Sequence, residues 1–180
     1  YPGCGYGGSC FPKDVKALVQ TAEQNGYDMR VLKAVEEVNE RQKSVLFEKL
    51  RRHYGNLRGK TIALWGLAFK AETDDMREAT SLVTIGHLLE AGCTVRVFDP
   101  AAMDEARRRL GDAVIYASDI YDAAKGADAL LLLTEWKQFR LPSWARVHDL
   151  MRNPIVFDGR NIYDPAEMRK NGFEYYSIGR

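Results

Sequence analysis

Apolar residues in the first third of the chain recur at steps of three and four, the spacing of an amphipathic α-helix. One such run predicts a helix over residues 13–25, which Gly26 ends. A second run predicts a longer helix over residues 29–54, with charged faces beside its apolar stripe. A helix of that length, about 37 Å, exceeds what a small core needs. It suits a spine between domains or one half of a dimer interface, and a solvated surface helix also fits the pattern.

The period changes after residues 55–60, a polar segment bounded by glycine. Short apolar runs then alternate with helical patterns. This predicts an α/β fold, in which a helical segment with a long connecting helix is followed by a Rossmann-like, mostly parallel sheet covered by helices on both faces. We expect a helical unit over residues 1–57 and a Rossmann-like domain over residues 58–180. The predicted strands are 61–66, 94–98, 114–116, 129–134, 155–157 and 174–177, and the predicted helices of this domain are 78–91, 103–110, 120–125, 143–151 and 165–170.

Composition excludes some classes of function. The chain has 180 residues and a formal net charge of +1, so it lacks the basic field that favours nucleic acid. Its apolar runs all fall short of the roughly 20 residues that span a bilayer, so we expect no membrane partner. Three cysteines are an odd and sparse set, which fits a reducing compartment and predicts a cytoplasmic protein.

The segment before the first predicted helix carries the strongest candidate chemistry. It reads YPGCGYGGSCFPKD, with four glycines followed closely by Cys10. Glycines let the backbone lie close to a ligand, and a thiol just ahead of a helix N-terminus is favoured as the thiolate. Lys13 adds a cation, and Asp14 lies one turn beyond Cys10 as a candidate base or water-orienting group. We predict an active-site segment, although residue types alone are equally compatible with an inert cysteine in a Gly-rich turn.

Two other interpretations of this segment are weaker. Residues 3–8 have the G-x-G-x-x-G spacing of a dinucleotide-binding loop, but that fingerprint requires a preceding strand, and only Tyr1 and Pro2 come before it. A metal site or disulfide made by Cys4 and Cys10 lacks the C-x-x-C spacing and has no second Cys pair or His nearby. We therefore expect no metal.

Other candidates follow the predicted strands, where ligands bind in such sheets. The loop after the first strand is long and offers Lys70 and Arg77 to a diphosphate. Arg160 follows an Asp-Gly turn after a late strand. Solvated surface positions are the alternative for these three cations. We expect Asp99 to form an Asp-Pro turn rather than bind a ribose, and Trp136 to close the core.

The run GYGGSCFPKD, residues 5–14, resembles the catalytic-cysteine signature of the nucleotide-sugar 6-dehydrogenases, most closely the UDP-glucose 6-dehydrogenases. Further matches are G-x-A-F-K followed by D-x-R-E-A within residues 66–79, T-E-W at 134–136 and D-G-R at 158–160. The resemblance covers essentially the whole chain. It implies an NAD-dependent enzyme of polysaccharide precursor metabolism that oxidises UDP-glucose twice at C6 to UDP-glucuronate.

The resemblance also implies roles for individual residues. Cys10 would be the nucleophile that attacks the C6 aldehyde, and Asp14 the carboxylate that assists it. Lys13 and Arg77 would contact NAD. The sugar nucleotide would contact Lys70 and Arg160, together with the loop residues Tyr1, Gly3, Gly5, Tyr6 and Gly7.

The same resemblance implies a homodimer formed through the helix at 29–54 and a separate NAD-binding domain outside these residues. Because the sequence opens inside the catalytic loop, we expect part of a longer protein, without turnover by itself. Two alternatives stay open. One is a dehydrogenase for GDP-mannose or a UDP-N-acetylhexosamine, and the other is a non-catalytic nucleotide-binding module in which Cys10 is inert.

Overall fold

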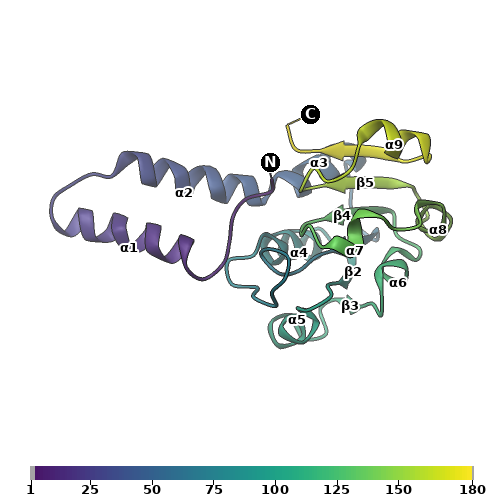
Figure 1. Ribbon diagram of the computed structural model, residues 1–180, viewed down its shortest axis with the longest axis horizontal. Coiled ribbons are helices and arrows are strands. Elements are labelled where there is room, and N and C mark those ends of the chain that lie inside the picture. The colour runs from purple at the N-terminus through teal and green to yellow at the C-terminus, as the bar shows by residue number, and fades with distance from the viewer. Residues whose placement is uncertain (1–2, 180) are drawn as a thin grey trace.

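A computed structural model describes residues 3–179, which form a sheet domain with a projecting helical hairpin (Figure 1). In this part of the chain six strands pair in the order β3-β2-β1-β4-β5-β6, all in parallel. The α/β prediction is confirmed, and the sheet is wholly rather than mostly parallel. The strands are β1 Thr61–Trp65, β2 Thr94–Phe98, β3 Ile115–Tyr116, β4 Ala129–Leu132, β5 Ile155–Asp158 and β6 Glu174–Ser177. The helices are α1 Phe11–Gln24, α2 Arg30–Lys43, α3 Val45–Tyr54, α4 Thr80–Glu90, α5 Met103–Leu110, α6 Ile120–Ala124, α7 Lys137–Arg140, α8 Trp144–Leu150 and α9 Pro165–Lys170.

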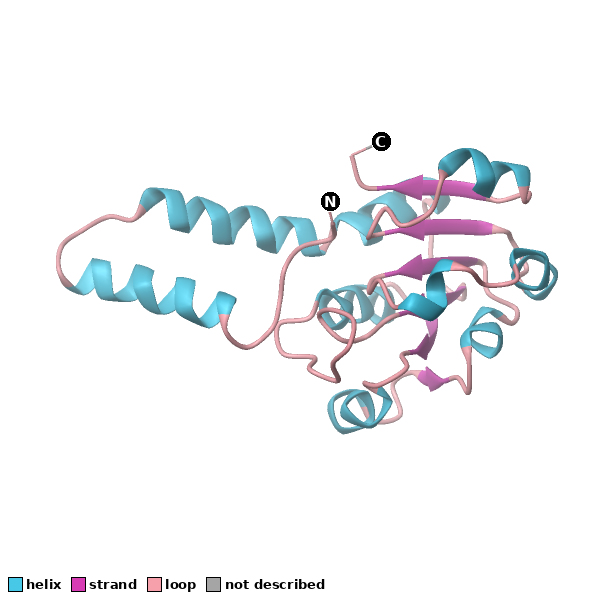
Figure 2. Ribbon diagram, in the orientation of Figure 1, coloured by secondary structure: helices cyan, strands magenta, loops and turns pink. Residues whose placement is uncertain are grey.

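Alternate residues of the central strands pack into two separate cores. Ile62 and Leu64 of β1 join apolar residues of α3, α4 and α5 on one face of the sheet. Ala63 and Trp65 join apolar residues of α6, α7, α8 and α9 on the other face. Successive side chains of a strand point to opposite faces, so a strand covered on both sides is apolar throughout. The magenta strands accordingly lie between two groups of helices (Figure 2).

The direction in which strands are added reverses beside β1. The chain first places β2 and β3 on one side of β1, then crosses to place β4, β5 and β6 on the other. In open sheets of this order, ligands bind beyond the carboxyl ends of the strands at the point of reversal. The segments that leave the sheet at this edge are 66–79 after β1, 133–136 after β4 and 159–164 after β5.

Helices α1 and α2 form a hairpin that extends away from the sheet domain (Figure 1). The single helix expected over residues 29–54 is bent, because Ser44 separates α2 from α3. The Ser44 hydroxyl lies 3.1 Å from His87 Nε2 of α4. The apolar spacing continues through Ser44, so the sequence pattern gave no sign of this break. Its consequence is that α3 packs on the sheet while α2 leaves it.

The other predicted elements occur close to their expected positions, with two differences. Helix α7, of four residues, was not predicted, and α4 begins at Thr80 instead of residue 78. Glu78 has a left-handed backbone, with φ of 53°, which a helix interior does not allow. Among residues 3–179, the structure contains no helix with the length and apolar character that crossing a bilayer requires.

Candidate active site

Residues 3–10 (the Cys loop) cross the carboxyl edge of the sheet. Cys4 near its start is buried: its thiol donates to Leu133 O at 3.9 Å, and the Thr80 hydroxyl donates to Cys4 O at 3.0 Å. Burial raises the pKa of the Cys4 thiol, which favours its protonated form. Cys4 and Cys10 are both free thiols. Cys4 is thus a packing residue, and the two cysteines are not joined.

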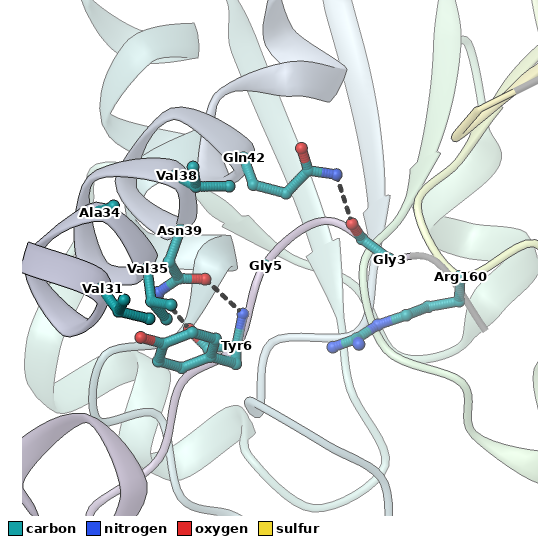
Figure 3. Close-up of a pocket in the computed structure, with 10 residues that line it drawn as sticks. All are labelled: Gly3, Gly5, Tyr6, Val31, Ala34, Val35, Val38, Asn39, Gln42 and Arg160. Carbon is teal, nitrogen blue, oxygen red and sulfur yellow. Dashed lines mark hydrogen bonds between the residues drawn. The ribbon is translucent and has the colours of Figure 1, made fainter. Parts of the chain in front are cut away.

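Helix α2 holds the outer side of the Cys loop with two amide side chains (Figure 3). Tyr6 N donates to Asn39 Oδ1 at 2.8 Å, and Asn39 Nδ2 donates to Tyr6 O at 3.2 Å. Gln42 Nε2 donates to Gly3 O at 2.6 Å. Asn39 is buried, and a buried polar group without its partner is costly. These bonds therefore fix the backbone of the loop.

Two glycines of the Cys loop are required by close packing within the chain. A Cβ atom at Gly7 would lie 2.3 Å from Glu78 O, and one at Gly8 would lie 2.8 Å from the Phe69 ring. Gly8 also has a φ of 95°, and its N–H donates to Arg77 O at 2.8 Å. The loop thus lies directly on the segment that follows β1.

Cys10 is exposed and immediately precedes α1, whose first turn contains Pro12. The partial positive charge of a helix N-terminus favours an anion at this position. Ser9 Oγ lies 3.6 Å from the Cys10 sulfur. Asp14 N donates to Cys10 O at 2.9 Å, and Lys13 Nζ lies 3.6 Å from the Asp14 carboxylate. The arrangement presents the Cys10 thiol to solvent at the start of a helix whose first turn carries Lys13 and Asp14.

The Cys loop contributes to two clefts, of about 730 and about 670 Å³. The first is largely apolar and is lined by Gly3, Gly5, Tyr6, Arg160 and six residues of α2: Val31, Ala34, Val35, Val38, Asn39 and Gln42 (Figure 3). The second is lined by Gly8, Ser9, Lys13, Lys16, Ala17, Gln20, Arg77, Glu78 and Arg109.

The predicted binding residues divide between the two clefts. Gly3, Gly5, Tyr6 and Arg160, expected at the sugar nucleotide, line the first cleft, and Lys13 and Arg77, expected at NAD, line the second. Gly7 and Lys70 are not among the lining residues of either cleft. Lys70 is exposed, with Nζ 5.4 Å from the centre of the Phe69 ring. Tyr1 lies outside the described residues.

The second cleft is basic. The Arg77 guanidinium makes a bidentate pair with the Asp75 carboxylate, donating from Nε at 3.0 Å and from Nη2 at 2.9 Å. These hydrogen bonds lower the pKa of the Asp75 carboxyl. Lys13, Lys16, Arg77 and Arg109 line this cleft with one carboxylate, Glu78. Such an excess of cations suits phosphate oxygens. Each of the four cations also pairs with a carboxylate, and these are Asp14, Glu78, Asp75 and Glu105 respectively.

Arg160 joins three strand ends. Its Nε donates to Leu133 O after β4 at 2.7 Å, and its Nη2 donates to Phe69 O after β1 at 3.0 Å. Its backbone N donates to the carboxylate of Asp158, the last residue of β5, at 2.8 Å. Glu135 lies beside the guanidinium, 3.1 Å from Nε. Arg160 is therefore held rigidly, with Nη1 facing Gly3 and the first cleft.

Asp99 is buried at the end of β2 and accepts five hydrogen bonds. Four come from the backbone N–H groups of residues 67–68 and 101–102, and the fifth from Trp136 Nε1 at 3.1 Å. These bonds agree with the expected turn. They also account for the burial of the Asp99 carboxylate without a ribose as its partner. Trp136 is buried, as expected for a residue that closes the core.

Four residues that position the Cys loop had no role predicted from the sequence: Asn39, Gln42, Lys43 and Glu78. A partial signal exists, because Asn39 and Lys43 lie four residues apart and so share a face with the apolar Val35. Buried polar residues on an otherwise apolar face are informative. Their partners are 33 or more residues away along the chain, beyond the reach of local patterns.

The strand order and the two clefts are typical of a doubly wound nucleotide-binding protein, and the exposed Cys10 thiol lies on the loop that contributes to both clefts. The chain belongs to the UDP-glucose/GDP-mannose dehydrogenase family. The model of that family's UDP binding domain matches residues 63–165, and the model of its central domain matches residues 1–41.

Individual relatives agree with this assignment. The chain is 53% identical, over its whole length, to a UDP-glucose 6-dehydrogenase of Pseudomonas aeruginosa, and 47% identical, over 99% of its length, to the UDP-glucose 6-dehydrogenase YwqF of Bacillus subtilis. It spans only 41% and 40% of those two proteins. A solved UDP-glucose dehydrogenase of Pyrobaculum islandicum superposes on 97% of the chain with a TM-score of 0.85 and 36% identity, and 38% of that structure is covered.

Proposed function

We propose that this chain supplies the nucleophile and the sugar-nucleotide-binding edge of an NAD-dependent UDP-glucose 6-dehydrogenase. The observation that carries the proposal is the exposed Cys10 thiol at the N-terminus of α1, at the end of a loop whose other residues line both clefts. Cys10 and Asp14 themselves are not among the lining residues of either cleft. Family membership supports the substrate, because the relatives at 53% and 47% identity are UDP-glucose 6-dehydrogenases.

The chemistry explains why a thiol is needed. After the C6 alcohol has become an aldehyde, the Cys10 thiolate adds to the aldehyde carbon and forms a thiohemiacetal. Loss of a second hydride from C6 gives a thioester, and water then hydrolyses the carbon–sulfur bond to release the carboxylate and the thiol. Asp14 orients that water and takes up its proton. Covalent capture keeps the reactive aldehyde from escaping between the two oxidations.

The second cleft fits the cofactor. NAD⁺, when bound, accepts one hydride, so the two oxidations at C6 would use two NAD⁺ molecules in succession. Its diphosphate needs fixed positive charge, which Lys13 and Arg77 would supply, with Lys16 and Arg109 close by. The sugar nucleotide would bind on the Cys-loop side of the first cleft, against Gly3, Gly5, Tyr6 and the guanidinium of Arg160, so that the apolar residues on its α2 side stay available to a second subunit. Lys70 and Gly7 do not line this cleft, and their contact with the sugar nucleotide remains a prediction.

A homodimer through residues 29–54 is part of the proposal. The apolar face of α2 is exposed, with Val31 at 77% and Val38 at 55% of their full accessibility. Exposed apolar helix faces of this kind often form subunit interfaces. The division into units 1–57 and 58–180 remains a prediction, and limited proteolysis that cuts first within residues 55–60 would support it.

The test of the proposed function is Cys10→Ser in the full-length protein that contains this chain. We expect release of UDP-glucuronate, followed by rapid-quench mass analysis, to slow by about a hundredfold or more, since the nucleophile is lost. Cys93→Ser is the matched control, because Cys93 is buried and donates to Leu57 O, a bond that a hydroxyl can also make. An undiminished rate in Cys10→Ser would contradict the proposal.

The isolated chain spans about two fifths of its relatives, so we also expect it to have no turnover alone. NADH formation by the isolated chain with UDP-glucose, abolished by Cys10→Ala, would contradict this expectation.

A further inference from the structure

Glu78 lies where four parts of the molecule meet. It stands between the long loop after β1 and the start of α4, in a left-handed backbone with a φ of 53°. Non-glycine residues seldom adopt this conformation, and they keep it only where surrounding contacts require it. The contacts of Glu78 therefore indicate what the strained backbone serves.

The Glu78 carboxylate forms an ion pair with one lysine from each helix of the hairpin. Lys16 of α1 lies 3.2 Å from Oε1, and Lys43 of α2 lies 3.3 Å from Oε2. The Lys43 side chain is only 3% exposed, and its other carboxylate partner is Glu40 at 2.8 Å. Exposed ion pairs contribute little to stability, but a buried ammonium needs its partners. The bonds from Lys16 lower the pKa of the Glu78 carboxyl, so the carboxylate is charged at neutral pH.

The backbone of the same segment touches the Cys loop. Glu78 O lies where a side chain at Gly7 would be, and Arg77 O accepts from Gly8 N at 2.8 Å. The side chain of Arg77 faces the second cleft, next to the Cys loop. One residue thus connects α1, α2, the Cys loop and the sheet domain.

We propose that Glu78 is a positioning residue, which holds the hairpin carrying Cys10 in register with the sheet edge carrying Arg77 and Arg160. The inference rests on the proposed function. The thiol and Asp14 belong to the hairpin, whereas Lys70, Arg77 and Arg160 belong to the sheet domain. Loss of the Glu78 carboxylate therefore moves the nucleophile relative to the bound substrate and leaves the sheet-borne binding residues in place.

The kinetic test is Glu78→Gln in the full-length protein. We expect kcat for UDP-glucose oxidation to fall by about tenfold or more, the order that a small misplacement of a reacting group causes, with KM changed by less than about twofold. Glu78→Gly should lose as much, because glycine accepts the left-handed backbone but has no carboxylate. The matched control is Lys33→Gln. It removes bonds to Glu23 at 2.7 Å and Asp28 at 2.9 Å near the other end of the hairpin, and it should leave kcat unchanged.

A second readout needs no turnover. Hydrogen exchange should accelerate in residues 5–14 of Glu78→Gln by about tenfold, as local opening becomes easier, and should stay at the wild-type rate in Lys33→Gln. A wild-type kcat in Glu78→Gln, a full kcat in Glu78→Gly, a KM that rises as much as kcat falls, or unchanged exchange would each overturn the inference. Absence of sugar-nucleotide oxidation by the wild-type protein would instead count against the proposed function, and hydrogen exchange would still decide the role of Glu78.

Discussion

Gly7 and Gly86 differ in whether the fold has room for a side chain at their positions. A Cβ atom at Gly7 would lie 2.3 Å from Glu78 O, whereas one at Gly86 in α4 would meet nothing within 4 Å. The first glycine is required by the close approach of two backbones. The second has no such contact. Its effect is to raise the conformational entropy of the unfolded chain, which disfavours the helix.

We therefore expect Gly7→Ala to lower the free energy of unfolding by about 1–3 kcal/mol, the cost of overpacking. Gly86→Ala should raise it by about 0.5–1 kcal/mol. Urea unfolding of the two variants beside the wild type measures both changes. Equal effects of the two substitutions would mean that the Cys loop is not packed on the Glu78 backbone.

Asp99 yields a second prediction at this scale. Its carboxylate accepts five N–H donors, and an asparagine would turn an NH₂ group toward some of them. Asp99→Asn should therefore lower the free energy of unfolding by about 2–4 kcal/mol. Asp104→Asn is the control, because Asp104 is exposed and bonds to Arg107 on its own helix, so its change should stay within about 0.5 kcal/mol. Similar urea midpoints for the two variants would contradict the structural role of Asp99.

At the residue scale the sequence indicated candidate reactive and charged residues more readily than the residues that hold them in place. Cys10, Lys13, Asp14, Arg77 and Arg160 stand in a recognisable order along the chain. Asn39 does not, and Glu78 stands in the D-x-R-E-A run without any sign of its role, because the roles of both consist of contacts with partners distant along the chain. Local spacing cannot report a contact between α2 and a loop that precedes it by more than thirty residues.

Among the secondary-structure elements, apolar periodicity was sufficient for the strands and the longer helices. Every strand occurs at a predicted position, and only Asp158 at the end of β5 falls outside its predicted range. The signal is clearest for β1, β4 and β5, because a strand buried on both faces is a continuous apolar run. The pattern failed at Ser44, where the helical spacing persists although the axis bends, and at α7, whose four residues are too few to show a period. Both features depend on tertiary packing.

The connection between the Cys loop and α2 should be sensitive to high pH. The Tyr6 hydroxyl donates to Glu36, and burial followed by this bond raises the pKa of Tyr6 from 10.0 to about 12. The folded state therefore favours the neutral phenol. This stabilisation is complete below a pH of about 10 and is lost as the pH rises through about 12.

Titration of tyrosinate absorbance tests this point. Glu36→Gln should shift one tyrosine pKa downward, because the carboxylate that disfavours the phenolate is removed. Glu37→Gln is the control, since Glu37 pairs only with Arg41 at 3.8 Å among the contacts described. Identical titration curves for the two variants would mean that Glu36 does not hold Tyr6.

At the scale of the whole molecule, the predicted site residues are distributed between the sheet domain and the part of the chain that leads into the projecting hairpin (Figure 1). The sheet domain holds Arg160 through three strand ends, and the Cys loop that leads to Cys10 contacts residues 77–78 through Gly7 and Gly8. The proposed homodimer would hold the hairpin from its outer side as well. The exposed apolar face of α2 is the surface on which a second copy of the chain would do this.

The corresponding prediction concerns self-association. A double variant, Val31→Glu with Val38→Glu, places two charges on the exposed face of α2 and should weaken the dimer by about tenfold or more, because unpaired charges are costly in an apolar interface. Leu141→Glu is the control: Leu141 is 93% exposed but belongs to the sheet domain, between α7 and α8. Sedimentation velocity of the full-length protein over a range of concentrations measures both. If the double variant sediments as the wild type does, α2 is not the interface, and the outer side of the hairpin must be held by contacts within one subunit.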